Sequence, residues 1–144
     1  MSSLLPITIN KLQHVGIPVT DIIRSEAFYA RFGFNKVMQS PFTHDGGTGT
    51  CIMMQLRDII IELYQMPAKK LDEIRTRKNG HVDHIAFDVD NVDEVFKALK
   101  EDGSFAIIED QPVTLPFWQH GCKYFNMTGP DGEILEFNEI IKSV

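Results

Sequence analysis

The chain has 144 residues, of which 43% are hydrophobic and 24% charged, a composition typical of a globular domain with a sizeable core. A net charge of −6 argues against a nucleic-acid-binding protein, which needs a basic face. No apolar run approaches the roughly 20 residues of a membrane span, and the first residues do not resemble a signal peptide. The length predicts a single domain spanning residues 1–144. Two cysteines are too few for a disulfide framework, so we expect reduced thiols and a cytoplasmic protein.

Alternating apolar residues and turn-forming residues predict a strand, a helix and three further strands in the first half. The four strands are expected at residues 12–19, 34–39, 51–56 and 59–64. The helix can begin after a cap at Thr20 or Asp21 and end before Gly33. Its apolar positions are Ile22, Ile23, Ala27, Phe28, Ala30 and Phe32. Residues 41–49, rich in glycine and threonine, are expected to form a loop.

The second half repeats this pattern after a basic linker, in which one helical turn is expected. Its strands are expected at residues 82–89, 105–108, 122–127 and 133–140. Asp90 or Asn91 can cap its helix and Gly103 can end it, with a loop at 112–121 and a turn at 128–132. Cys51 and Cys122 serve to align the halves. The predicted parts are module one at about 10–66, the linker at about 67–80 and module two at about 81–142.

Each module carries one histidine and one glutamate at matching places: His14, Glu62, His84 and Glu136. Side chains alternate between the two faces of a strand, and the apolar neighbours of these four residues need a helix to cover them. All four polar residues should therefore lie on the face turned away from the helices, where Gly16 and Ala86 leave room.

Two imidazoles and two carboxylates gathered on one buried face would be costly without a charged partner. A divalent cation resolves that cost, and a mixed set of nitrogen and oxygen donors suits Ni, Zn, Co, Mn or Fe. The sequence therefore predicts a metal site made of His14, Glu62, His84 and Glu136.

The chain resembles the vicinal oxygen chelate superfamily, which includes glyoxalase I, fosfomycin-resistance proteins, methylmalonyl-CoA epimerase, extradiol dioxygenases and bleomycin-resistance proteins. The resemblance rests on His14-Val-Gly-Ile-Pro-Val-Thr-Asp21, Phe28-Tyr-Ala-Arg-Phe-Gly-Phe34, Ile61-Glu-Leu63, His84-Ile-Ala-Phe-Asp-Val-Asp90 and Gly129-Pro-Asp-Gly-Glu-Ile-Leu-Glu-Phe137. It implies an α+β fold of two βαβββ modules forming a cupped mixed sheet, usually in a homodimer. It also implies a divalent metal that chelates adjacent oxygens of a small-molecule substrate.

Within the superfamily, the His14, Glu62, His84 and Glu136 set matches glyoxalase I-like (lactoylglutathione lyase-like) proteins one residue at a time. Methylmalonyl-CoA epimerase has Gln where Glu62 stands, and the dioxygenase and fosfomycin types lack that ligand. The resemblance implies a lyase or isomerase that moves a proton on a carbon next to a carbonyl, through an enediolate stabilised by the metal. Glu136, in preference to Glu62, is expected to leave the metal or loosen and act as the general base, and the other glutamate can return the proton.

Two positions depart from bacterial glyoxalase I and argue against glutathione as the cosubstrate. That enzyme commonly has Arg four residues after its first ligand and Asn four residues after its first glutamate, where this chain has Pro18 and Met66. One rival interpretation is an acyl-thioester epimerase of the methylmalonyl-CoA epimerase type. Another is a bleomycin-resistance-like module that binds a drug or metabolite without turnover, with its pocket framed by residues 46–50. Redox ring cleavage is disfavoured because Glu62 leaves fewer open metal positions.

Three further side chains are candidates for lining the substrate site: Tyr64, Trp118 and His120. For each of them, an ordinary place in the core or in a loop is an equally good interpretation.

Overall fold

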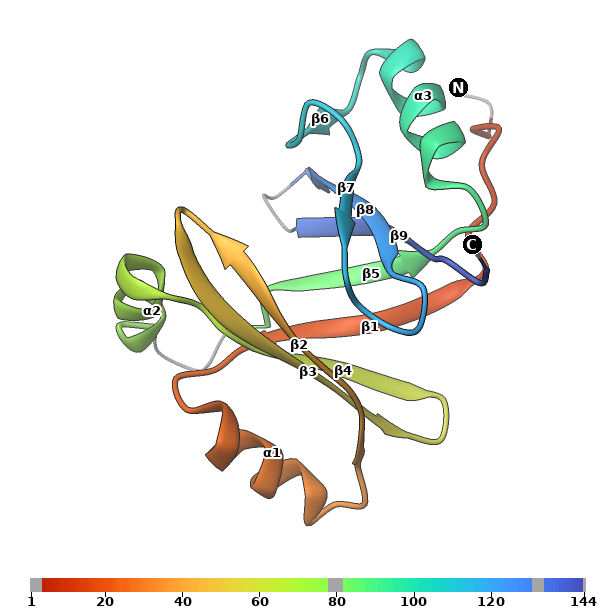
Figure 1. Ribbon diagram of the computed structural model, residues 1–144. Helices are drawn as coiled ribbons and strands as arrows, with labels where there is room; N and C mark the ends of the chain where they lie inside the picture. Colours follow the sequence, from red (N-terminus) through yellow and green to blue (C-terminus); the bar gives the residue numbers. More distant parts are fainter. Residues whose placement is uncertain (1–3, 78–81, 131–133, 144) are drawn as a thin grey trace. The chain divides into compact units, whose positions relative to one another are not determined.

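The computed structural model describes residues 4–77, 82–130 and 134–143. The chain divides into two compact units (Figure 1). The central unit comprises His14–His84, and the terminal unit comprises Met1–Gln13 and Ile85–Val144. The chain passes from one unit to the other at His14 and again at His84, which are the two histidines predicted to bind metal.

The central unit is built on a mixed sheet with the strand order β2-β3-β4-β1. Its strands are β1 (Lys11–Pro18, which begins in the terminal unit), β2 (Asn35–His44), β3 (Gly47–Leu56) and β4 (Ile59–Gln65). β1 runs parallel to β4, whereas the β2/β3 and β3/β4 pairs are antiparallel. Its helices are α1 (Ile22–Ala30) and α2 (Ala68–Arg75).

Helix α1 packs along one face of this sheet (Figure 1). Asp21 caps it by accepting a hydrogen bond of 3.1 Å from the backbone N–H of Arg24. The backbone N–H of Ile22 donates to Oε1 of Gln65 at the end of β4, over 2.9 Å. This hydrogen bond satisfies a first-turn N–H that has no partner within the helix and ties α1 to β4. The core below the helix contains Val19, Ile22, Ile52, Met54, Ile61 and Leu63.

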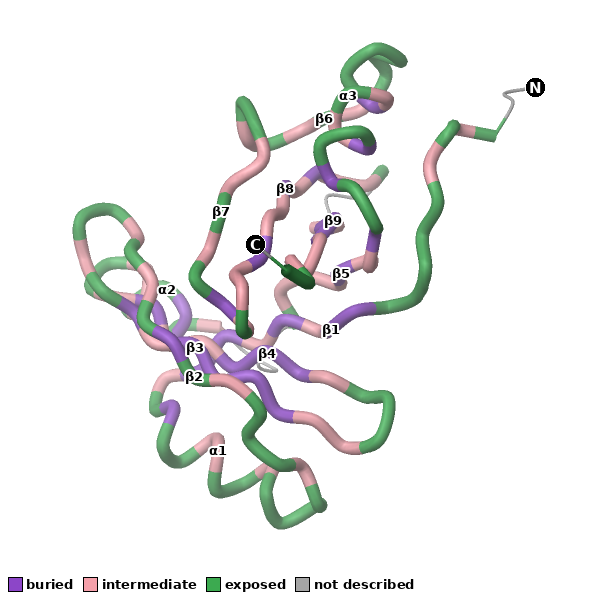
Figure 2. The backbone as a smooth tube through the Cα atoms, turned by 45° about the vertical axis from the view of Figure 1, so that its right-hand side comes forward, coloured by how far each residue is buried: buried purple, intermediate pink, exposed green. Residues whose placement is uncertain are grey.

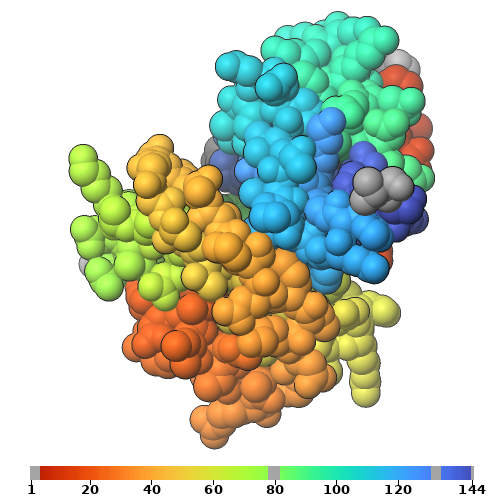
Figure 3. All heavy atoms as spheres, viewed as in Figure 1, coloured from red at the N-terminus to blue at the C-terminus, as the bar shows by residue number. Residues whose placement is uncertain are grey.

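The apolar positions predicted for α1 are mostly not in the core. Ile23, Phe28 and Phe32 are 78%, 50% and 63% exposed, and the orange-red segment containing α1 forms part of the surface (Figure 3). The residues of α1 that pack on the core are Ile22 and Tyr29, two helical turns apart. The predicted positions span more than one face of the helix, and the sheet covers a single face.

The loop predicted at residues 41–49 is wrong, because these residues continue a long β2/β3 hairpin. β2 runs to His44 and β3 begins at Gly47. Asp45 and Gly46 form the turn, with φ values of 48° and 77° that suit a two-residue hairpin connection. Pro41 is tolerated because β2 lies at the end of the strand order, where a missing N–H costs little.

The segment predicted as a linker contains the eight-residue helix α2, which is longer than the single turn expected there. The end of that segment, residues 78–80, lies outside the described residues, as does residue 81, with which module two was predicted to begin.

The terminal unit has the strand order β5-β9-β8-β6, with β7 paired to β8. Its strands are β5 (His84–Asp88, which begins in the central unit), β6 (Ala106–Ile107), β7 (Val113–Leu115), β8 (Cys122–Thr128) and β9 (Ile134–Ile140). The predicted loop at 112–121 therefore contains a short strand. The predicted turn at 128–132 and the predicted strand start at 133 lie partly outside the described residues.

Helix α3 (Val92–Asp102) follows the predicted pattern in its caps. Asn91 caps the backbone N–H of Glu94, and Gly103 ends the helix in the left-handed conformation at φ 79°. The N–H of Val92 donates to Oε1 of Glu139 on β9 over 3.0 Å, as Ile22 does to Gln65 in the central unit. The core under α3 contains Val89, Val92, Val95, Leu99, Phe125, Met127 and Phe137.

The α+β class and the two βαβββ patterns predicted from the sequence are confirmed, with β7 as an added strand. Figure 2 shows buried residues concentrated along β1, β3 and β4 in the central unit. Among the described residues, no helix has the length and apolar character that a membrane crossing requires.

The strand registers correct the predicted alignment of the two cysteines. Cys51 lies two residues before the partner of Glu62 in the β3/β4 ladder. Cys122 lies four residues before the partner of Glu136 in the β8/β9 ladder. The two cysteines therefore occupy different positions of the repeat.

Candidate functional site

Three of the four predicted metal ligands meet in the central unit. Nε2 of His14 on β1 and Nε2 of His84 at the start of β5 lie 3.2 Å apart. Oε1 of Glu62 on β4 lies 3.1 Å from Nε2 of His84 and 3.7 Å from Nε2 of His14. Ile61 and Leu63, which flank Glu62, belong to the core under α1, so Glu62 occupies the opposite face of β4 as the alternation predicts.

Gly16 makes the position of the His84 imidazole possible. The parallel register places Gly16 directly beside Glu62 on the neighbouring strand. A Cβ atom on Gly16 would lie 2.0 Å from Cε1 of His84, a distance at which one of the two must move. The space that is left because Gly16 has no Cβ atom is therefore filled by the ring of His84.

The three converging groups influence one another electrostatically. Two imidazole lone pairs and a carboxylate oxygen repel one another unless a proton or a cation lies among them. Burial alone would raise the pKa of Glu62, but His14 and His84 outweigh it and hold that pKa below its ordinary value of 4.5. The group is thus organised around positive charge.

The donor set fits a divalent metal ion. Two donors that each lie about 2.1 Å from one cation can be at most about 4.2 Å apart. The atoms Nε2 of His14, Nε2 of His84 and Oε1 of Glu62 are separated by 3.1 to 3.7 Å, so one ion could contact all three. Imidazole nitrogen and carboxylate oxygen are ligands shared by several first-row metals.

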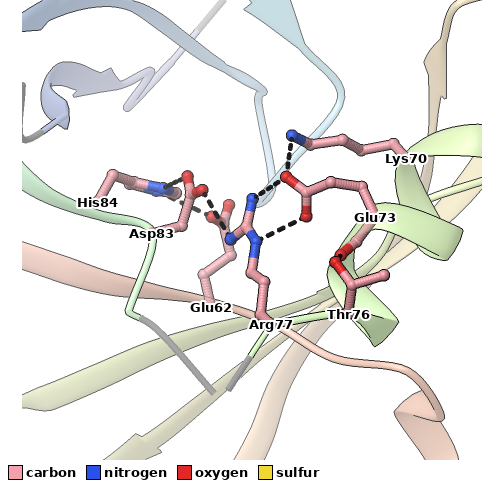
Figure 4. A network of polar contacts seen from close by, with 7 residues as sticks. All are labelled: Glu62, Lys70, Glu73, Thr76, Arg77, Asp83 and His84. Carbon is pink, nitrogen blue, oxygen red and sulfur yellow. Dashed lines mark hydrogen bonds and ion pairs between the residues drawn. The ribbon is translucent and has the colours of Figure 1, made fainter. Parts of the chain in front are cut away.

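A chain of polar contacts extends from His84 to helix α2 (Figure 4). Nδ1 of His84 lies 3.1 Å from Oδ2 of Asp83, and Oδ1 of Asp83 lies 3.6 Å from Nη1 of Arg77. Arg77 donates to both carboxylate oxygens of Glu73, over 2.7 and 2.8 Å. Lys70 donates to the same Glu73 carboxylate over 3.2 Å. Beyond the imidazole, the groups alternate in charge from Asp83 to Lys70 on α2.

The acidic members of this chain are held ionised. Burial would raise the pKa of Asp83, but its hydrogen bond with His84 and the nearby charges lower it. The guanidinium of Arg77 holds the pKa of the exposed Glu73 at about 2. Burial raises the pKa of Tyr64, with further contributions from the carboxylates of Asp83 and Glu62, so its hydroxyl remains a donor.

The fourth predicted ligand, Glu136, lies on β9 of the terminal unit, where it is buried. Its Oε2 accepts a hydrogen bond of 2.8 Å from Nδ2 of Asn138. Oδ1 of Asn138 in turn accepts from Nε2 of Gln13 over 3.1 Å, and the same nitrogen lies 3.0 Å from Oδ1 of Asp88. The Asn138 amide therefore fixes the Glu136 carboxylate, and Gln13 in turn fixes that amide.

The three candidate substrate-lining residues fall in both units. Tyr64 lies in the central unit on β4, with its ring centroid 6.0 Å from that of His84. Trp118 and His120 lie in the terminal unit, between β7 and β8. Trp118 has φ 65°, and its indole Nε1–H is buried without a hydrogen-bond partner among the described residues.

The central unit also has a cavity of about 640 Å³ between the start of α1, β3 and the start of α2. Its lining includes Thr48, Gly49 and Thr50 from the segment suggested to frame a pocket, together with Ile22 and Gln65. Ile22 and Gln65 meet on the α1 side of the sheet, so this cavity opens on the face opposite to Glu62.

Sequence reasoning missed the residues that support the predicted ligands: Asp83, Arg77, Gln13 and Asn138. The contact between Gln13 and Asn138 is long-range, because these two residues are 125 positions apart. One pattern could have found three of them: Gln13, Asp83 and Asn138. Gln13 and Asp83 each stand immediately before a predicted histidine ligand, and Asn138 and Tyr64 each stand two residues after a predicted glutamate.

The chain belongs to the Glyoxalase/Bleomycin resistance protein/Dioxygenase superfamily, whose family model matches residues 11–137. This superfamily includes enzymes and typically uses a divalent metal. The predicted resemblance to the vicinal oxygen chelate superfamily is confirmed at this level.

Similar proteins agree with this assignment. The chain is 33% identical over 131 residues to the uncharacterized protein YwbC of Bacillus subtilis (strain 168), covering 88% of this chain and 95% of YwbC. The crystal structure of methylmalonyl-CoA epimerase from Mycobacterium tuberculosis matches with a TM-score of 0.75 at 16% identity, covering 96% of this chain and 93% of that one. Hypothetical protein BH1468 from Bacillus halodurans C-125 matches with a TM-score of 0.74 at 21% identity, covering 93% and 96%. At these identities the two solved structures show a shared fold.

Proposed function

We propose that this protein is a divalent-metal-dependent lyase or isomerase that moves a proton on a carbon next to a carbonyl group. The proposed ligands are His14, Glu62, His84 and Glu136. The observation that carries the proposal is the convergence of two imidazole nitrogens and one carboxylate oxygen within 3.7 Å of one another in the central unit. A divalent cation held there would act as a Lewis acid towards a carbonyl oxygen of the substrate.

The two glutamates have different proposed roles. Oε1 of Glu62 faces both imidazoles, so Glu62 is the residue that holds the histidine pair together. Glu136 is the proposed general base that takes the proton from carbon and returns it. The amide of Asn138 holds Oε2 of Glu136 over 2.8 Å, which limits the directions in which that carboxylate can accept a proton. We also propose a homodimer, the assembly common in the superfamily.

The first experiment measures metal content by inductively coupled plasma mass spectrometry after reconstitution with Ni, Co, Mn or Zn. We expect about one tightly held ion per chain, lost in the His84→Ala and Glu136→Gln double variant. His44→Ala with Glu139→Gln is the matched control, since His44 lies in the β2/β3 hairpin and Glu139 faces α3. A folded wild-type protein that holds no metal would overturn the proposed function.

The second experiment identifies the reaction by proton exchange. Candidate hemithioacetals and acyl thioesters are incubated with the metal-loaded protein in D₂O, and deuterium at the carbon next to the carbonyl is followed by NMR. Hemithioacetal conversion supports the glyoxalase I-like reaction. Deuterium exchange into an acyl thioester without other change supports the methylmalonyl-CoA epimerase-like alternative. The solved structure of a methylmalonyl-CoA epimerase shares the fold of this chain. Glu136→Gln should abolish either one.

A second candidate function is a binding module without turnover. The observation that favours it is the cavity of about 640 Å³, which is partly lined by Thr48, Gly49 and Thr50. Tight ligand binding by the metal-free protein, weakened when Thr50 is changed to a bulky residue and unaffected by His84→Ala, would support this candidate over the enzyme.

A further inference from the structure

We propose that Asp83 is a positioning residue for the metal site, and that helix α2 holds Asp83 in place through Arg77. Asp83 would fix the His84 imidazole so that Nε2 faces His14 and Glu62. This inference rests on the proposed function, because it assumes that His84 is a metal ligand.

The contact between Asp83 and His84 determines which ring nitrogen is available. Oδ2 of Asp83 lies 3.1 Å from Nδ1 of His84, and an ionised carboxylate can only accept a hydrogen bond. Nδ1 therefore carries the hydrogen, and the lone pair of Nε2 is directed towards the donor group formed with Glu62, 3.1 Å away. Metal-binding histidines commonly have such a carboxylate at their other nitrogen, and its loss typically weakens metal binding about 10- to 100-fold.

Asp83 is itself restrained from two sides. Its Oδ1 lies 3.6 Å from Nη1 of Arg77, and the hydroxyl of Tyr64 is close enough to lower the pKa of Asp83. The Arg77 side chain is only 19% exposed and is fixed by a two-bond contact with Glu73 on α2. Figure 4 shows Asp83 between His84 and Arg77. A carboxylate held in this way has little freedom to swing away from the imidazole.

The position of the His84 ring is also limited by Gly16. Gly16 lies so close that even a methyl group there would overlap the imidazole. A ring enclosed by Gly16 and anchored at Nδ1 has one well-defined orientation. Preorganisation of this kind lowers the cost of ordering a ligand when the metal binds.

The internal repeat supports the same inference independently. Gln13 precedes His14 as Asp83 precedes His84, and Asn138 follows Glu136 by two residues as Tyr64 follows Glu62. In the terminal unit Gln13 donates to Asn138, and in the central unit the hydroxyl of Tyr64 lowers the pKa of Asp83. The same pair of positions therefore interacts beside each predicted ligand pair, although the residue types differ.

The test is a titration of the purified full-length chain with Co²⁺, followed by its visible absorption spectrum and dissociation constant. We expect Asp83→Asn, which keeps an acceptor oxygen but loses the charge, to bind about 10-fold more weakly, and Asp83→Ala to bind about 100-fold more weakly. Both should change the spectrum, because the ligand geometry changes. Asp72→Asn is the matched control: Asp72 lies exposed on α2 and pairs with Arg75, so the same charge is lost away from the site.

Three outcomes separate the two proposals. If folded Asp83→Ala binds cobalt with the same affinity and spectrum as the wild type, the positioning role is overturned and the metal site still stands. A folded wild-type chain that binds no cobalt would overturn both. If Asp83→Ala does not fold, Asp83→Asn and Arg77→Met decide the question, with weakened binding supporting the inference and wild-type binding in both overturning it.

Discussion

Gly16 and His84 stand in a steric relationship that no other residue at position 16 would permit, because a Cβ atom there would lie 2.0 Å from Cε1 of His84. We therefore expect Gly16→Ala to displace the imidazole and to weaken metal binding by more than ~100-fold, beyond the range typical of outer contacts. Isothermal titration calorimetry with Zn²⁺ would measure this. Gly46→Ala is the control: Gly46 has open space around it but a φ of 77°, so alanine there strains the β2/β3 turn without any clash at His84. Equal affinities for the two variants would contradict the prediction.

The lowered pKa of Glu62 gives the metal-free protein a defined response to acid. A carboxyl group with a folded-state pKa below its ordinary value of 4.5 stabilises the fold above that pH. The stabilisation is lost as the pH falls through the lower folded-state pKa. The stability difference between wild type and Glu62→Gln should thus be constant near neutrality and shrink below about pH 4.5. Urea unfolding from about pH 7 to pH 3 measures it, and a difference that grows in acid would refute the assignment.

The cap of α3 should contribute to stability and not to metal binding. Asn91 accepts from the N–H of Glu94, so Asn91→Ala should lower the free energy of unfolding by about 1 kcal/mol. Asn91→Asp keeps an acceptor oxygen and should be nearly neutral. Chemical denaturation of the metal-free chain compares them. A loss of metal affinity in Asn91→Ala would mean that α3 influences the site in a way its contacts do not suggest.

Apolar residues beneath α1 and on the outer face of α1 should differ strongly in their contribution to the free energy of unfolding. Leu63 is fully buried under α1, and Leu63→Ala should cost about 2 to 5 kcal/mol. Ile23 is 78% exposed on α1, and Ile23→Ala should stay within about 0.5 kcal/mol of wild type. Thermal and urea unfolding would both report the contrast. Similar losses in the two variants would show that the outer face of α1 is covered in solution.

Local sequence patterns predicted α3 well and α1 only in part. In α3 the spacing of Val92, Val95 and Leu99 coincides with a cap at Asn91 and a glycine stop, so several independent preferences agree. In α1 the apolar residues are spread around the helix, and only the sheet decides which of them are covered. The hairpin at 41–49 was missed because the tolerance of Pro41 depends on the edge position of β2, which is a tertiary property.

For the candidate site, strand alternation was enough to place Glu62 on the face opposite Ile61 and Leu63. The supporting network was beyond local reasoning. Asp83 is marked only by its place before the predicted ligand His84, and nothing beside Arg77 distinguishes it from the solvent-exposed side chains of a basic, polar stretch. Their importance follows from the contact of Asp83 with Arg77 and of Arg77 with Glu73 on α2, which only the three-dimensional structure shows.

In both β4 and β9, the two faces of the strand carry residues with different roles. Glu62 and Gln65 are three positions apart, and so are Glu136 and Glu139; in each pair the first residue belongs to the predicted ligand set and the second binds the first turn of a helix. Because an odd offset puts the two tasks on opposite sides of the strand, substitutions on one side leave the other intact. Such separation lets a duplicated module change its chemistry without losing its helix, and it gives a physical reason why this architecture could diversify in evolution.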